Sequence, residues 1–261
     1  MKIIFLNTWG GRAYEPLMQF LCGQRSTTDF FCLQEVFDSP DHREVSWGGR
    51  ADLLAGLRRA LPEHEGYFSA CLHDFDGDEY TDFPLAHGNA IFAKKDLPIA
   101  SRGDLLITGG GWPGRGDMHA YPHKLQYVRF ERAGLRYALV NLHGMAYPGS
   151  KRDTPERLAQ SRNIVDFLAG EEGEKILGGD FNLLPDTESI RMIERAGMRN
   201  LIAAYCITTT RSPFSYGQYP ESDRQYFADY AFVSPGIAVE SFSVPQMEVS
   251  DHLPLVLEVA V

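Results

Sequence analysis

The chain has 261 residues, of which 44% are hydrophobic, and its 25 Lys and Arg residues against 35 Asp and Glu residues give a formal net charge of −10. A chain of this size can bury a substantial core, and we expect one domain over residues 1–261. The acidic balance disfavours tight, non-specific capture of nucleic acids and other polyanions. It does not exclude a nuclease, because cations bound at a site can neutralise carboxylates there.

Export, membrane insertion and disulfide bonding are not indicated. Asn7, Arg12 and Glu15 interrupt the N-terminal region, which is not typical of a signal peptide. The apolar runs are far shorter than the roughly 20 residues that a membrane helix needs. The 4 cysteines form no CxxC pair and no cluster with histidine, which predicts reduced core residues. We therefore expect a cytoplasmic protein without stable membrane insertion, and no protein partner is evident.

Apolar residues predict the order strand, helix, strand at the start of the chain. Continuous apolar runs at residues 3–6 and 30–33 are typical of buried strands, and residues 14–21 carry apolar side chains at helical spacing. A second amphipathic helix is expected at residues 53–61. The acidic segment 63–82 superficially resembles a calcium loop but lacks its full spacing, so we expect a solvated loop there.

The rest of the chain continues this alternation. Further strands are predicted at residues 90–93, 126–130, 137–142, 227–233 and 253–261. One helix should begin at Thr154-Pro155, with Thr as N-cap and Pro at the first helical position, and another should span residues 187–196 before Gly197. Strands that outnumber helices and alternate irregularly with them predict an α/β (α+β) fold of mixed sheets with helices packed outside.

Polar residues directly follow or interrupt the apolar strands at several places. They are Asn7, Glu35, His143, Asp180, Asn182, Asp229, Asp251 and His252. Taken singly, an Asn after a strand is commonly a turn former, and a lone His is commonly structural. Buried carboxylates are costly unless they are paired or bound to a cation, so the acids at these strand ends need a shared explanation. A bound divalent metal supplies one.

The metal hypothesis assigns oxygen ligands to three of these residues. Glu35 with Asp251, Asn7 and water offers the hard donors that Mg²⁺ or Mn²⁺ prefers, and leaves positions open for phosphate oxygens. Zinc is disfavoured because His and Cys residues are not clustered.

The segment Gly178-Gly179-Asp180-Phe181-Asn182 offers groups that could act on a water molecule. We expect the glycines to end a strand in a turn, and an extended backbone would place Asp180 and Asn182 on one side, about 7 Å apart. One could then activate a water while the other stabilises charge on phosphorus-bound oxygen. His143 and His252 could stabilise negative charge or protonate a leaving oxygen, with Asp229 as the orienting carboxylate.

Six short blocks in this order resemble the endonuclease/exonuclease/phosphatase superfamily. This superfamily includes DNase I-like nucleases, apurinic endonucleases, neutral sphingomyelinases and inositol polyphosphate phosphatases. The blocks span nearly the whole chain and are Leu6-Asn7, Gln34-Glu35, Asn141-Leu142-His143, Gly179-Asp180-Phe181-Asn182, Asp229-Tyr230 and Ser250-Asp251-His252. The resemblance implies a four-layer α/β/β/α sandwich of two mixed sheets, with the site at one end of the sheets. It also implies metal-dependent hydrolysis of a phosphoester by direct water attack.

The resemblance also implies a role for each matching residue. Glu35 would be the principal metal ligand, assisted by Asn7 and Asp251. Asp180 would position and activate the water, and Asn182 would contact the phosphate. The catalytic set would be His143, Asp180, Asn182, Asp229 and His252, with both histidines on the scissile phosphate and Asp229 oriented on His252.

Three positions refine the resemblance. Trp9 stands where members similar to apurinic endonucleases carry Asp, which disfavours an abasic-site enzyme; the surrounding residues look more like the neutral sphingomyelinase branch. The Arg157 and Gln160 pair matches a recurring family pattern, and we expect it to hold a helix against the loop that follows His143.

Substrate choice should depend on long segments around the site. The candidate substrate-binding residues are Asn89, Trp112, Arg115, Tyr147, Lys151 and Arg152. The glycine-rich segment 109–116 could stack on a base or cover a ligand, or be an ordinary surface loop. The segment 144–153 could contact a second phosphate or a nucleic-acid backbone, or be a solvated loop. Asn89 could contact phosphate or His143, or form a turn before a strand.

These observations predict a phosphoesterase that acts foremost on phosphodiester bonds, and its phosphoester substrate could be a nucleic acid, a small molecule or a lipid headgroup. A nuclease and a sphingomyelinase-like or small-molecule phosphodiesterase or phosphatase remain open alternatives. A catalytically silent binding module of the same fold is a distant alternative, and its signature would be the loss of residues such as Glu35, Asp180 or His252, which are present.

Overall fold

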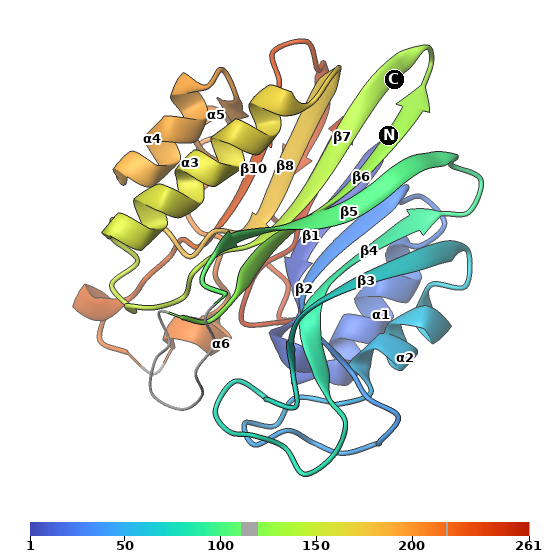
Figure 1. Cartoon of the computed structure of the whole chain (residues 1–261), viewed down its shortest axis with the longest axis vertical. Helices are drawn as coiled ribbons and strands as arrows, with labels where there is room; N and C mark the ends of the chain where they lie inside the picture. The colour runs from blue at the N-terminus through green and yellow to red at the C-terminus, as the bar shows by residue number, and fades with distance from the viewer. Residues whose placement is uncertain (111–119, 218, 261) are drawn as a thin grey trace.

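The computed structural model describes residues 1–110, 120–217 and 219–260 and contains two six-stranded sheets packed face to face (Figure 1). The first sheet has the order β11 (Val239–Ser243), β12 (Leu255–Val259), β1 (Lys2–Asn7), β2 (Phe30–Asp38), β4 (Ala86–Lys94), β3 (His64–His73). The second has the order β5 (Ile99–Thr108), β6 (His123–Arg132), β7 (Leu135–His143), β8 (Glu174–Asp180), β10 (Asp229–Val233), β9 (Arg199–Asn200).

Both sheets are mixed and have helices outside. The pairs β1 with β2 and β7 with β8 are parallel, and their neighbours pair antiparallel. Helices α1 (Tyr14–Gln24) and α2 (Leu53–Ala60) lie on the first sheet, and α3 (Pro155–Gly170), α4 (Glu188–Arg195) and α5 (Leu201–Ala204) lie on the second (Figure 1). Short helices are η1 (Trp9–Gly11), α6 (Pro213–Tyr216) and η2 (Glu221–Asp223). The predicted α/β/β/α sandwich is confirmed.

Burial on both faces explains the continuous apolar run of β1. Ile3 and Phe5 belong to the core between the two sheets, whereas Ile4 and Leu6 belong to the core beneath α1 and α2. All four side chains are at most 1% exposed. A strand buried on both faces needs no alternation of apolar and polar residues.

The two glycines of the Gly178-Gly179 pair lie within β8, so the predicted turn at this point is wrong. The strand continues through both glycines to Asp180. A Cβ atom at Gly178 would lie 2.7 Å from Cζ of Phe5, which faces it from β1. Gly179 has φ 129° and lies so close to β7 that a Cβ atom would be 2.2 Å from the carbonyl oxygen of Leu142. The glycines therefore serve close packing and not chain reversal.

The four strands that lie at the sheet edges have no counterpart in the sequence prediction. These are β3, β5, β9 and β11. In β5 most side chains are exposed, and in β11 only Phe242 is buried. The solvated loop expected over residues 63–82 is likewise wrong in part, because this segment contains β3 and the buried Phe75 and Asp76. A strand with few buried side chains lacks both a continuous apolar run and a strict alternation, which are the patterns on which the prediction relies.

The cysteines differ from their predicted placement. All are free thiols, but Cys22 and Cys206 are exposed and only Cys32 is fully buried. The prediction of core residues is therefore wrong for Cys22 and Cys206. Across the described ranges 1–110, 120–217 and 219–260, no helix has both the length and the apolar character needed to cross a membrane.

We expect Gly178→Ala to lower the free energy of unfolding by about 1–3 kcal/mol, because the added methyl group collides with the Phe5 ring between the sheets. Urea denaturation measures this change. Gly170→Ala is the matched control, since a Cβ atom there meets nothing within 4 Å. Equal stability of the two variants would contradict close packing at Gly178.

Candidate active site

Strand register places three polar side chains in one row across the second sheet. His143 of β7 is paired with Asp180 of β8, and Asp180 is paired with Asp229 of β10. Asp180 lies on the same face of β8 as Gly178, which packs against Phe5 of the first sheet. The row therefore faces the first sheet, at the end of the core between the sheets.

The first sheet contributes Asn7 and Glu35 at the same end. Asn7 is the last residue of β1, and its strand partner is Gln34 of β2. The register of β2 against β4 shifts between Leu33 and Val36, and Glu35 within this bulge has φ 53°. The Thr8 hydroxyl lies 2.8 Å from the carbonyl oxygen of Gln34 and 3.0 Å from that of Glu35. The bulge changes the direction in which the Glu35 side chain points, as bulges beside functional sites commonly do.

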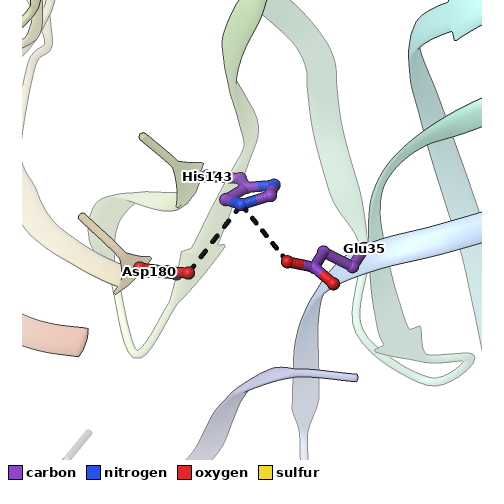
Figure 2. Close-up of side chains that lie close together, drawn as sticks. All are labelled: Glu35, His143 and Asp180. Carbon is purple, nitrogen blue, oxygen red and sulfur yellow. Dashed lines mark ion pairs between the residues drawn. The ribbon is translucent and has the colours of Figure 1, made fainter. Parts of the chain in front are cut away.

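Side chains from the two sheets meet around Asp180. The Asn7 amide nitrogen lies 2.9 Å from Oε1 of Glu35 and 3.0 Å from Oδ2 of Asp180. Nε2 of His143 lies 3.7 Å from Oε1 of Glu35 and 3.8 Å from Oδ2 of Asp180, so that the imidazole points between the two carboxylates (Figure 2). One compact group thus combines residues from β1, β2, β7 and β8.

His252 extends this group on the other side of Asp180. Its Nδ1 lies 2.9 Å from both carboxylate oxygens of Asp229, and its Nε2 lies 3.6 Å from Oδ2 of Asp180. A carboxylate at Nδ1 fixes the ring orientation and directs Nε2 toward Asp180. Burial and the nearby Arg211 would lower the pKa of His252, but the carboxylates of Asp229, Asp251 and Asp180 outweigh them and raise this pKa.

Burial and neighbouring charges move the pKa values of Glu35 and Asp180 in opposite directions. Burial raises the pKa of Glu35, and the negative charge of Asp251 adds to the effect. Burial alone would also raise the pKa of Asp180, but His252 and Lys151 outweigh it and hold the pKa below its usual range. The structure therefore favours an ionised Asp180, since the cations that surround it stabilise its charge.

Arg211 is a site residue for which the sequence predicted no specific role. Its guanidinium donates to Oδ2 of Asp251 at 2.9 Å and contacts the ring of His252. Residues 211 and 252 also form an isolated β-bridge. Nothing near Arg211 in the sequence distinguishes it, because its partners lie about 40 residues away along the chain.

Asn182 departs from the predicted extended geometry, because β8 ends at Asp180 and Asn182 has φ 54°. The backbone turns so that the amide N–H of Asn182 donates to Oδ1 of Asp180 at 2.9 Å. The Asn182 side chain accepts from Nζ of Lys151 at 2.8 Å and donates to the carbonyl of Gly144 at 3.1 Å. Burial, together with Arg211, lowers the pKa of Lys151 to about 8.

The cluster is suited to a cation. Among the described residues, two sets have ligand atoms within 4.8 Å of one another: Glu35, His143 and Asp180, and Asp180, Asp229 and His252. The carboxylates of Glu35 and Asp180 converge on one cleft of about 370 Å³ together with that of Asp251. Carboxylate oxygens are the ligands that Mg²⁺ and Mn²⁺ prefer. A divalent ion would offset the repulsion between these acids.

Two of the predicted metal ligands have other partners in this structure. The Asn7 side-chain oxygen accepts from the backbone N–H of Trp9 at 3.0 Å, so that its nitrogen faces Glu35. Asp251 is paired with Arg211. The ligand roles of Asn7 and Asp251 remain predictions.

The structure separates the predicted substrate-binding residues. Tyr147 and Lys151 line the cleft, and the Tyr147 side chain is 49% exposed. Arg152 instead pairs with Asp186 at the surface. Asn89 is fully buried, and its amide donates to the carbonyl of Lys124 in the other sheet, so that it lies between the two sheets and does not line the cleft. The two remaining candidates, Trp112 and Arg115, lie outside the described residues.

A second cavity of about 260 Å³ adjoins the cluster. Glu35 and His143 line it together with residues that have no assigned role, among them Trp47, Asp78, His87, Tyr121 and His123. Sequence reasoning missed this cavity, because its lining comes from separate loops and strand ends that only the fold brings together.

The predicted structural role of Arg157 and Gln160 is confirmed. The buried guanidinium of Arg157 donates to the carbonyl oxygens of Met145, Ala146, Pro148 and Arg152. Gln160 accepts from the backbone N–H of Met145 at 2.9 Å. Helix α3 thus fixes the loop that follows His143, including the cleft residue Lys151.

The sandwich fold and the acid–histidine cluster together define a DNase I-like phosphoesterase class of protein. The sequence model of the Endonuclease/Exonuclease/phosphatase family matches residues 4–252, and the chain belongs to this family. Its members are phosphoesterases, which supports the same broad activity class here. No curated protein sequence matches the chain.

Several solved structures have the same fold. A mannosyl-6-phosphatase of Bacteroides thetaiotaomicron is 19% identical with a TM-score of 0.70, and each chain covers 100% of the other. A family member from Leptotrichia buccalis is 16% identical with a TM-score of 0.71, again with 100% coverage of both chains. Truncated TDP2 of Caenorhabditis elegans is 18% identical with a TM-score of 0.65, with 100% of this chain and 97% of that chain covered. At these identities the likeness shows the fold alone.

We expect Arg157→Lys to lower the free energy of unfolding by about 2–4 kcal/mol, because an ammonium group cannot serve all the carbonyl oxygens that the planar guanidinium reaches. Chemical denaturation measures the loss. Arg162→Lys, at an exposed position of the same helix, should change stability little. Unchanged stability of Arg157→Lys would show that these hydrogen bonds do not hold the loop.

Proposed function

We propose that the protein is a divalent-metal-dependent phosphoesterase in which Asp180 activates a water that attacks phosphorus directly. The observation that carries this proposal is the position of the Asp180 carboxylate, which lies within 4 Å of Asn7, His143 and His252. Glu35 completes the group from the first sheet. The arrangement provides an ionised proton acceptor beside two histidines that can donate to phosphoryl oxygens.

The proposed metal is Mg²⁺ or Mn²⁺, with Glu35 as the principal ligand and Asn7 and Asp251 as further ligands. The donor set fits such an ion, because it is rich in oxygen and contains no cysteine. When bound, the ion would neutralise negative charge on the phosphate and polarise its oxygens. Arg211, which pairs with Asp251, and Lys151 provide further positive charge in the cleft.

The protein residues would act by positioning and charge stabilisation. Asp180 would orient the water and accept its proton, a role for which its lowered pKa keeps it ionised. His143 and His252 direct Nε2 toward the same carboxylate and would donate to phosphoryl oxygens placed there. Asp229 would act as a positioning residue through Nδ1 of His252.

The predicted role of Asn182 and the predicted preference for phosphodiesters have less direct support. The Asn182 side chain is bonded to Lys151 and Gly144, which supports a role in holding the Lys151 ammonium at the cleft. Contact of Asn182 with phosphate remains a prediction. The preference for phosphodiesters also remains a prediction, since one structural neighbour is named a mannosyl-6-phosphatase.

We expect Glu35→Gln to weaken Mn²⁺ binding at least about tenfold in calorimetry, because the amide removes the charge that attracts the ion. Glu131→Gln, which changes an exposed Glu of β6, is the control for the loss of one negative charge and should bind as the unaltered protein does. If both variants keep the affinity of the unaltered protein, Glu35 is not the principal ligand.

We expect Asp180→Asn to lower turnover at least about 10³-fold, because the neutral amide cannot accept a proton from water. The assay compares a bis-aryl phosphodiester, an aryl phosphate and single- and double-stranded DNA, each with Mg²⁺, Mn²⁺ or a chelator. Asp166→Asn, on the exposed face of α3, should retain turnover. Metal-dependent hydrolysis that survives in Asp180→Asn would rule out the role of Asp180. No hydrolysis by the unaltered protein would favour the binding-module alternative.

A further inference from the structure

The cavity beside the metal cluster is placed to receive the part of a substrate that leaves the phosphorus. Glu35 and His143 belong both to the wall of this cavity, which measures about 260 Å³, and to the cluster that surrounds Asp180. A phosphoryl group held at the cluster would therefore extend its ester substituent toward the cavity. The volume lies below the roughly 300–1,000 Å³ of sites for drug-sized ligands, which favours a single small group.

The buried residues that line the cavity include neutral side chains with polar atoms. Nδ1 of His87 lies 2.7 Å from the Tyr121 hydroxyl. Nε2 of the same ring is buried and has no hydrogen-bond partner among the described residues. The His87 side chain is only 6% exposed and lines the cavity, so a polar group bound there could satisfy this nitrogen.

Burial keeps the histidines of this wall uncharged. It lowers the pKa of both His87 and His123 to about 3, and the neighbouring His143 adds to the effect. Neutral imidazoles donate or accept hydrogen bonds but do not attract anions as a cation would.

The acidic residues of the cavity discourage an anionic occupant. The Asp76 carboxylate is already hydrogen-bonded to the surrounding loops, because it accepts from the backbone N–H groups of Ser46, Asp78 and Glu79. The Asp78 side chain is exposed and lies at the cavity. Together with Glu35, these carboxylates would repel the phosphates of a nucleic acid or a polyphosphate.

Trp47 gives the cavity a fixed apolar surface. Its indole N–H donates to the carbonyl of Asp76 at 2.7 Å, and its ring centroid lies 5.6 Å from that of Phe37. Since these contacts hold the indole, the surface is formed before a ligand binds. An apolar face beside neutral hydrogen-bonding groups suits a ring or chain that has C–H surfaces and hydroxyl edges.

We propose that this cavity binds the leaving alcohol of the substrate and that this alcohol is a small, neutral, polyhydroxylated group, such as a single sugar or polyol. This inference rests on the proposed phosphoesterase function and names the substrate class for it. His87 and Asp78 would bond the hydroxyl groups, and Trp47 would cover the apolar face.

The test compares kcat/KM for a hexose 6-phosphate and for phenyl phosphate with Mn²⁺ present, in the unaltered protein and in two variants. Phenyl phosphate has a ring of similar size without hydroxyl groups. We compare the ratio of kcat/KM for the hexose 6-phosphate to kcat/KM for phenyl phosphate between variants. The different intrinsic reactivities of the two substrates cancel in this comparison. We expect Asp78→Ala and His87→Phe each to lower this ratio about tenfold or more, because each removes hydrogen-bonding atoms at the cavity.

Two controls keep the test decisive. His73→Ala changes an exposed residue near Asp78 in the chain that does not line the cavity, and should leave the ratio unchanged. Asp78 is itself exposed, so Asp78→Ala remains informative if His87→Phe fails to fold. An unchanged ratio in Asp78→Ala together with a folded His87→Phe would overturn the cavity assignment while leaving the phosphoesterase function intact.

Further substrates separate the remaining outcomes. Phosphocholine presents a cationic alcohol, and a short single-stranded DNA presents an anionic one. A higher kcat/KM for either of them than for hexose and glycerol phosphates would overturn the proposed substrate class. If the protein hydrolyses none of these compounds, and does not hydrolyse phenyl phosphate or a bis-aryl phosphodiester either, then the proposed phosphoesterase function fails and the inference fails with it.

Discussion

The burial of Asp180 between the two sheets is the constraint on which the arrangement of the site depends. Its side chain is only 1% exposed, and an isolated carboxylate at such a position would be strongly destabilising. The surrounding residues offset this cost: Asn7 donates to Asp180, and the raised pKa of His252 favours positive charge beside it. The charged state that catalysis would use is thus also the state that the buried surroundings stabilise.

The inner strands of both sheets could be predicted from the sequence, and the edge strands could not. The run Ile3 to Leu6 in β1 is apolar because a sheet or helix covers each face, and β12 alternates buried and half-buried side chains. Edge strands such as β5, with Arg102 and Asp104 exposed to solvent, carry no such pattern. Sequence periodicity reports burial, so a mostly exposed edge strand gives a weaker signal than a strand covered on one or both faces.

The candidate site shows the same division between local and tertiary information. Polar residues that end apolar runs, such as Asp180 and His143, were recognisable because a buried strand seldom ends in that way without a reason. Arg211 and His87 were not, since their partners lie far away in the sequence. Asn182 was misplaced, because only the structure reveals its left-handed backbone.

Desolvation has opposite consequences around Asp180 and around His87. This difference explains how one part of the site could bind a phosphate and the adjoining part a neutral group. Around Asp180, opposite charges accompany burial and keep the carboxylate ionised. Around His87, burial and the neighbouring His143 outweigh the Asp76 carboxylate and lower the pKa of the imidazole, which is therefore neutral. The first environment suits phosphate chemistry, which needs charge. The second suits hydroxyl groups, which need hydrogen bonds and would gain little from charge. The boundary between them lies at Glu35 and His143, which line both the cluster and the cavity.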